Sequence, residues 1–228
     1  MSTAERRTAR GLVEVRADTG PGKMTIGGYA AKFNTLSRNL GGFVERIDPG
    51  FFAKSEGDGW PEAMARYNHD DDFLLGTTAG GTLRLVVDGT GLDYTADLPS
   101  TRADVYELVQ RGDVTRSSFA FFCFEDDWSM TDQGFPLRTL LSGQLVDVAP
   151  VNSPAYLDTD TGLRSLAERA GATVEEVRAA AAGDGLARFL GRAPAATVID
   201  MAPTGQGDPH PLVSLRQRRA ELLRRRTP

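Results

Sequence analysis

The stretch VTRSSFAFFCFEDDW, residues 114–128, decides the fold class. Successive side chains of a β-strand point to opposite faces, so apolar residues of this stretch fall on both faces: Ser118, Ala120, Phe122 and Phe124 on one, and Phe119, Phe121 and Cys123 on the other. A strand with two apolar faces suits the wall of a small barrel or a central strand covered by helices. The stretch therefore predicts a sheet-based fold.

Segments on both sides of this stretch also predict strands. Residues 24–33 read as a strand of small residues, and residues 43–55 give a short strand, a Asp-Pro-Gly turn and a helical turn. The clearest hairpin covers residues 82–98, where apolar residues alternate on both arms around a glycine-containing turn. Residues 137–151 predict one or two further strands.

Helical signals lie between and after these strands. Thr101 is a candidate N-cap and Gly112 a candidate C-cap of one helix. A second helical segment begins at a capping box formed by Thr173 and Glu176, and Gly183 interrupts it. We therefore expect a mixed β/α, β-rich fold, a small closed or partly open β-barrel with flanking helices.

The chain divides by composition into three predicted parts. Residues 1–20 are expected to form a flexible N-terminal arm, and residues 21–165 the β-rich domain. Residues 166–228 are expected to form a helical, Pro/Gly-rich and Arg-rich tail. Its last stretch, residues 214–228, carries six arginines and one acid, which suits a solvated chain end or a segment that docks on an acidic partner.

Composition excludes several classes of function. A net charge of −5 gives no general reason to expect specific nucleic-acid binding. One cysteine and two histidines are too few for a Cys/His zinc site, and the acidic run at residues 70–72 lacks the ligand spacing of a calcium loop. No apolar run approaches the roughly 20 residues that cross a bilayer. We therefore expect no metal, no cofactor and no membrane partner.

Four positions are candidates for chemistry. His69 has the side chain that titrates nearest neutral pH, and the pair Ser117 and Ser118 stands at the start of an apolar strand, where it must bond the backbone or face a cleft. Asp147 alternates away from the valines beside it. A nucleophilic serine needs a histidine to take its proton and an acid to orient that histidine. Sequence spacing alone does not join these residues, so a structural role for each stays open.

Five segments, in order, resemble the prohead (capsid maturation) proteases of tailed phages, the HK97 type, which share their fold with the herpesvirus assemblins. They are GYAAKFNTLSRNLGGFVERIDPGFF, NHD, GTTAGGTLRLVVDGTGLDYTADLPST, VYELVQRGDVTRSSFAF and LVDVAPVNSPAYLDT. Each segment is weakly specific alone, but the five in sequence are specific. The resemblance spans about residues 25–165 and does not cover the tail.

The resemblance implies a serine endopeptidase of assemblin-like fold. It places the general base at His69 and the nucleophile at Ser118, which directly precedes the Phe of the family's S-F-x-F motif. Assemblins use a second histidine as the third member, but His210 matches no motif of the family. The resemblance instead assigns the orienting role to Asp147, the acidic position of the closing motif.

The same resemblance implies a place and partners for the enzyme. It would act in the procapsid interior within the bacterial host cytoplasm, process the major capsid protein and its scaffold segment, and cleave itself. The portal is a further candidate partner, and a homo-oligomer such as a dimer is expected. The tail would be cleaved off or dock on scaffold.

Two non-enzymatic functions are the alternatives. A capsid scaffolding module on the same fold would use the tail to sit inside the shell, with Ser118 and His69 as structural residues. A nucleic-acid binder would use Phe119 and Phe121 as stacking platforms, but this strand lacks interleaved basic residues.

Overall fold

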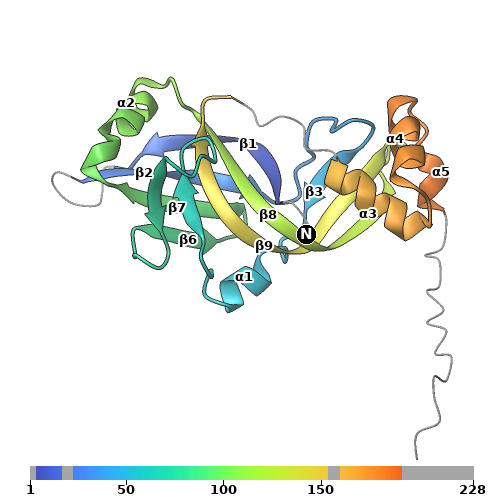
Figure 1. Cartoon of the computed structure of the whole chain (residues 1–228), viewed down its shortest axis with the longest axis horizontal. Coiled ribbons are helices and arrows are strands. Elements are labelled where there is room, and N and C mark those ends of the chain that lie inside the picture. Colours follow the sequence, from blue (N-terminus) through green and yellow to red (C-terminus); the bar gives the residue numbers. More distant parts are fainter. Residues whose placement is uncertain (1–3, 17–22, 154–159, 192–228) are drawn as a thin grey trace, which may run out of the picture. The chain divides into compact units, whose positions relative to one another are not determined.

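A computed structural model of the chain describes residues 4–16, 23–153 and 160–191 (Figure 1). The strands are β1 (Glu5–Val15), β2 (Met24–Lys32), β3 (Val44–Ile47), β4 (Met64–Arg66), β5 (Leu74–Thr77), β6 (Leu83–Val87), β7 (Gly91–Leu98), β8 (Arg116–Met130) and β9 (Pro136–Val151). The helices are α1 (Ala53–Gly57), the short 3-10 turn η1 (Ser100–Arg102), α2 (Ala103–Arg111), α3 (Asp160–Ala170), α4 (Val174–Ala182) and α5 (Ala187–Leu190). The predicted mixed, strand-rich fold class is confirmed.

The strands form one sheet in the order β5-β4-β9-β8-β1-β2-β7-β6. The two longest strands, β8 and β9, are antiparallel neighbours and run side by side in Figure 1. Two short strands pair with β9 in parallel, β3 near its beginning and β4 near its end. The long β8–β9 ribbon is therefore the frame on which the other segments are placed.

The sheet does not close into a barrel. Its path ends at β5 and β6, and no ladder among the described strands joins these two edges. They follow each other in the chain across a turn, but β5 pairs with β4 and β6 pairs with β7. The sequence predicted a small closed or partly open barrel, and a closed barrel is not found, because the second edges of β5 and β6 do not pair with each other.

The main core lies under the first half of β8. Phe119 and Phe121 are buried there, and their rings contact Phe52 and Phe51 edge to face, with centroids 5.7 and 5.3 Å apart. Burying one such side chain contributes about 1.5–3 kcal/mol. The predicted hairpin adds its apolar face to the same core: Leu83, Leu92, Tyr94, Ala96 and Leu98.

A second, smaller core gathers at the far half of the same ribbon. Trp128 of β8 packs with Phe43, and around them lie apolar residues of α3, α4 and α5. The predicted capping box is present, since the Thr173 hydroxyl accepts from the Glu176 N–H and the Glu176 carboxylate accepts from the Thr173 N–H. The helical segment is thus packed onto the sheet.

Two details differ from the sequence predictions. Thr101 lies inside η1, and α2 begins after Arg102 without a side-chain cap, whereas Gly112 ends the helix at a φ of +82° as predicted. Residues 5–15, predicted to belong to a flexible arm, form β1 between β8 and β2. Residues 137–151, predicted to form one or two strands, lie in one, β9. Pairing on both edges orders β1, a constraint that local composition does not reveal.

Several predictions concern residues outside the described part of the chain. These are the end of the closing motif from Pro154, the Pro/Gly-rich linker with His210, and the basic stretch at residues 214–228. They stay predictions, as do the domain boundaries. Among the helices of the described residues, none has the length and apolar content to cross a membrane.

Candidate active site

The structure brings the three predicted site residues into one hydrogen-bonded chain. Nε2 of His69 lies 2.7 Å from Oγ of Ser118, and Nδ1 of His69 lies 2.6 Å from Oδ1 of Asp147. All three are buried, with relative exposures of 0% for Ser118, 7% for His69 and 1% for Asp147. The three side chains therefore form a serine–histidine–aspartate arrangement in a water-poor part of the fold.

The β8–β9 ladder places the serine and the acid on one face. Ser118 pairs with Ala149, and Ala120 pairs with Asp147. Paired residues of an antiparallel ladder share a face, as do residues two apart on one strand, so Ser118 and Asp147 are diagonal neighbours on the same side. The register of this ribbon fixes both groups on extended strands.

The histidine reaches the ribbon from the turn between β4 and β5. Asn68 and His69 both have left-handed backbone, with φ of 56° and 58°. This conformation costs about 1–3 kcal/mol at a non-glycine residue and persists where the surroundings hold it. The Asn68 N–H donates to the Pro150 carbonyl at 3.0 Å, and the Asn68 side-chain oxygen accepts from the Asn152 N–H at 3.1 Å. The turn is thus tied to the end of β9, which presents the imidazole to Ser118.

The contacts of the imidazole define where its protons lie. An ionised carboxylate only accepts hydrogen bonds, so Nδ1 of His69 donates to Asp147 and a neutral ring keeps Nε2 as an acceptor towards Ser118. The Ser118 hydroxyl has a second acceptor, the backbone carbonyl of Arg7 on β1, at 2.9 Å. One hydroxyl hydrogen serves one acceptor at a time, so donation to Arg7 competes with donation to His69.

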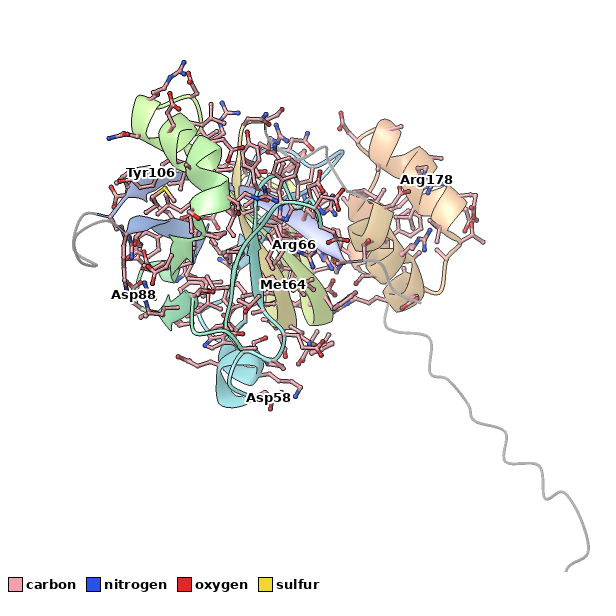
Figure 2. All side chains as sticks on the ribbon, turned by 60° about the vertical axis from the view of Figure 1, so that its left-hand side comes forward. Asp58, Met64, Arg66, Asp88, Tyr106 and Arg178 are labelled. Atoms are coloured by element: carbon pink, nitrogen blue, oxygen red, sulfur yellow. The ribbon has the colours of Figure 1, made fainter. Side chains whose placement is uncertain are left out.

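Arg66, at the end of β4 and labelled in Figure 2, contacts the far side of the acid. Its Nη1 lies 3.2 Å from Oδ2 of Asp147 and 2.8 Å from Oδ1 of the exposed Asp71. Asp147 is therefore held at both oxygens, by His69 on one and Arg66 on the other. This arrangement fixes the plane of the carboxylate relative to the imidazole.

Other reactive groups lie away from this chain of residues. Ser117 faces the core, where its hydroxyl bonds that of the buried Tyr94 at 3.2 Å, and burial raises the pKa of Tyr94. Burial also raises the pKa of Cys123 to about 12, so its thiol is a poor nucleophile at neutral pH. In the described segments, no three His, Cys, Asp or Glu side chains gather in a way that could hold a metal ion.

Two contacts of the site were not predicted from the sequence. Arg66 approaches Asp147 because β4 pairs in parallel with the end of β9, and the Arg7 carbonyl approaches Ser118 because β1 pairs with β8. Neither strand pairing is visible in alternation or composition. The motif resemblance covered Arg66 with no assigned role and did not cover Arg7.

Comparison with protein-family models gives the class of this protein. Residues 12–173 match the family described as caudovirus prohead serine protease. The match covers more than half of the chain, so the chain belongs to this family. No curated protein and no solved structure matches it.

The family predicted from the sequence is therefore confirmed, and the protein is an enzyme, a serine protease of the prohead type. This membership favours the enzymatic function over the scaffolding module and the nucleic-acid binder.

Proposed function

We propose that this protein is a serine endopeptidase that processes the major capsid protein and its scaffold segment inside the phage procapsid. Ser118 is the nucleophile, His69 the general base and Asp147 the residue that orients His69. The observation that carries the proposal is the continuous contact Ser118–His69–Asp147, with separations of 2.7 and 2.6 Å. The family match supports the reaction class and the setting in head maturation.

The geometry supports the two half-reactions of acyl transfer. As Oγ of Ser118 attacks the scissile carbonyl carbon, its proton passes to Nε2 of His69, and the imidazolium is stabilised by the Asp147 carboxylate at Nδ1. His69 then gives that proton to the leaving amine, which breaks the peptide bond and leaves an acyl group on Ser118. Water, deprotonated by His69, hydrolyses the ester and restores the serine.

The arrangement of the acid favours this proton transfer. Asp147 lies in a water-poor site, where charge–charge attraction is stronger than in water. Arg66 binds its second oxygen and so holds the first one towards the imidazole. We further propose that the protease cleaves its own chain when it is enclosed with scaffold, that it acts as a homo-oligomer, and that the portal is a secondary partner.

The test is cleavage of the major capsid protein co-expressed with the full chain. Wild type is expected to produce a shortened capsid protein of defined mass. Ser118→Ala should abolish that product while leaving the thermal unfolding temperature nearly unchanged, because one hydroxyl is lost from an intact fold.

Ser117→Ala is the matched control, because the neighbouring hydroxyl faces the core and bonds Tyr94. It is expected to keep the cleavage. Processing by Ser118→Ala at the wild-type rate would contradict the proposal, and so would loss of processing in Ser117→Ala alone.

A further inference from the structure

The first residues of β1 lie along the edge of β8 that carries Ser118. Glu5 pairs with Phe121, Arg7 with Phe119 and Thr8 with Ser118. The opposite edge of β8 pairs with β9 over the same residues. Both edges of the nucleophile's strand are therefore filled, and an extended peptide has no free edge beside Ser118 in this arrangement.

The backbone carbonyl of Arg7 also forms a hydrogen bond with the Ser118 hydroxyl. Its oxygen lies 2.9 Å from Oγ of Ser118 and accepts a hydrogen bond from it, and Ser118 has no exposed surface. A substrate must instead present a carbonyl carbon to Oγ while the hydroxyl hydrogen points to His69. The Arg7 peptide carbonyl therefore lies against the nucleophile. The hydrogen bond that it accepts turns the hydroxyl hydrogen away from His69, so this geometry does not lead to attack.

The side chains of this segment join one buried charge cluster, in which Arg7 also binds Glu5 and the two receptor groups, Arg138 and Glu45, also bind each other. The Glu5 carboxylate receives two bonds from Arg138, at 2.7 and 3.0 Å, and the Arg7 guanidinium gives two to Glu45, at 2.7 and 2.9 Å. All four residues are buried. Buried charges are held where partners of opposite sign meet them, so these receptor groups select an acid followed, two residues later, by a base.

The segment is separable from the rest of β1. Its pairing with β8 becomes irregular between Ala9 and Leu12, and β1 pairs with β2 only from Val13 onwards. The family match begins at residue 12, after this segment. Residues 5–9 therefore precede both the irregularity and the part of the chain that matches the family.

We propose that the edge of β8 beside Ser118 is the peptide-binding site, that it takes an extended segment with an acid two residues before a base, and that residues 5–9 fill it in a closed form of the protein. The basic residue is the one whose carbonyl meets Ser118. This proposal rests on the proposed function of Ser118, and it names the substrate class and the chain's own competitor for the site.

The first experiment measures whether residues 5–9 cover position 118, and it does not depend on catalysis. In a chain carrying Ser118→Cys and Cys123→Ser, the thiol at position 118 is alkylated by iodoacetamide with and without residues 2–9. Removal of these residues should raise the alkylation rate more than about tenfold, because strand opening is no longer required. An unchanged or lower rate in a folded protein, checked by its unfolding temperature, would overturn the proposal.

A milder variant keeps the test decisive if the truncated chain does not fold. Glu5→Ala combined with Arg7→Ala removes one charge of each sign and leaves Arg138 paired with Glu45 and Asp126. The same thiol should then react faster than in the parent, by less than after truncation. A rate equal to that of the parent would overturn the closed form.

The second experiment tests the charge pattern in trans. The peptide AERRTARG, residues 4–11, is added to the truncated thiol variant, with ARRETARG as a control of identical composition in which the acid and the base are exchanged. The native peptide should restore protection at a concentration at least about tenfold lower than the control, since the control sets like charges against Arg138 and Glu45. Equal protection by both peptides would overturn the specificity.

A separate readout distinguishes this inference from the proposed function. The truncated chain with Ser118 intact is assayed for hydrolysis of peptides that carry Glu-x-Arg or Arg-x-Glu. Faster cleavage of the first series, after the arginine, is the expected result. If the thiol at position 118 is uncovered by truncation but no peptide is hydrolysed, the inference that residues 5–9 cover Ser118 stands. The protease function of Ser118 is then overturned.

Discussion

At the scale of residues, His69 stands 49 positions before Ser118 and 78 before Asp147, yet the fold puts all three in hydrogen-bond contact. The sequence proposes them as site residues, because each falls in a motif that resembles the family's. Their distances could not be predicted, because they depend on the β8–β9 register and on two left-handed residues at the turn. Local pattern does not encode either one.

The acid of the site is best tested by an isosteric change. Asp147→Asn should lower kcat on a peptide substrate by about 10³–10⁴-fold, because an amide no longer fixes the tautomer of His69 or stabilises its protonated form. Asp71→Asn is the matched control, since Asp71 also contacts Arg66 but is exposed. Similar losses from both changes, with both proteins folded, would argue against the orienting role of Asp147.

Arg66 should act as a positioning residue with an electrostatic signature. Arg66→Gln removes a cation that lies near the imidazole, on the other side of Asp147. The loss of this cation favours the protonated form of the His69 ring. We expect kcat to fall by about tenfold or more and the acid limb of the kcat/KM profile to move to higher pH. Arg66→Lys should restore the limb towards its original pH because it restores the charge. If Arg66→Gln lowers kcat but leaves the pH profile of kcat/KM unchanged, the role of Arg66 is purely structural.

At the scale of elements, strands were easier to predict than their partners. The hairpin of β6 and β7 follows from alternation around a glycine-containing turn, and β8 follows from its apolar run. The partners of β1 and β4 do not follow, because both strands are defined by pairing rather than by a pattern of their own. These two strands supply the unpredicted contacts of the site.

The β6–β7 hairpin carries a pH-dependent ion pair. Arg84 donates two bonds of 2.9 Å to Asp97, and these, opposed by partial burial and aided by Thr25, lower the pKa of Asp97 to about 2. The carboxylate of the unfolded chain has the higher, ordinary pKa, so the pair stabilises the fold above that value and loses this contribution as the pH falls towards 2.

Asp97→Asn is therefore expected to lower the free energy of unfolding at pH 7, by about 1 kcal/mol or less because the pair is partly exposed. The difference from wild type should shrink between about pH 4 and pH 2. Urea unfolding at several pH values measures it. A difference that stays constant over this range would contradict the assigned ion pair.

At the scale of the whole molecule, a buried charge cluster connects the two cores. Arg138 binds Glu5, Glu45 and Asp126, and Asp126 also accepts from Ser165 of α3. The cluster thus joins the sheet, the strand β1 that covers Ser118 and the helical segment. The cluster was not predicted, because its members lie in five separate segments of the chain. In each segment, the alternation of polar and apolar residues places these charged side chains on the surface.

Removing the central cation should be costly. Arg138→Met leaves three acids with one buried cation, Arg7, near them, and a buried charge without its partner costs about 3–5 kcal/mol. Arg84→Met, at the partly exposed pair with Asp97, is the control and should cost about 1 kcal/mol or less. Denaturant unfolding of both variants measures the loss of unfolding free energy. Equal losses would mean that the cluster does not connect the two cores.

The central claim is that His69 activates Ser118, and covalent labelling tests it most directly. The full chain is incubated with a serine-directed fluorophosphonate, and the modified residue is mapped by mass spectrometry in wild type and in His69→Gln. We predict a label on Ser118, none on Ser117, and a rate at least about 100-fold lower in His69→Gln, because the hydroxyl then has no base to take its proton. A label mapped to another residue, or a rate on Ser118 that His69→Gln leaves unchanged, would contradict the account.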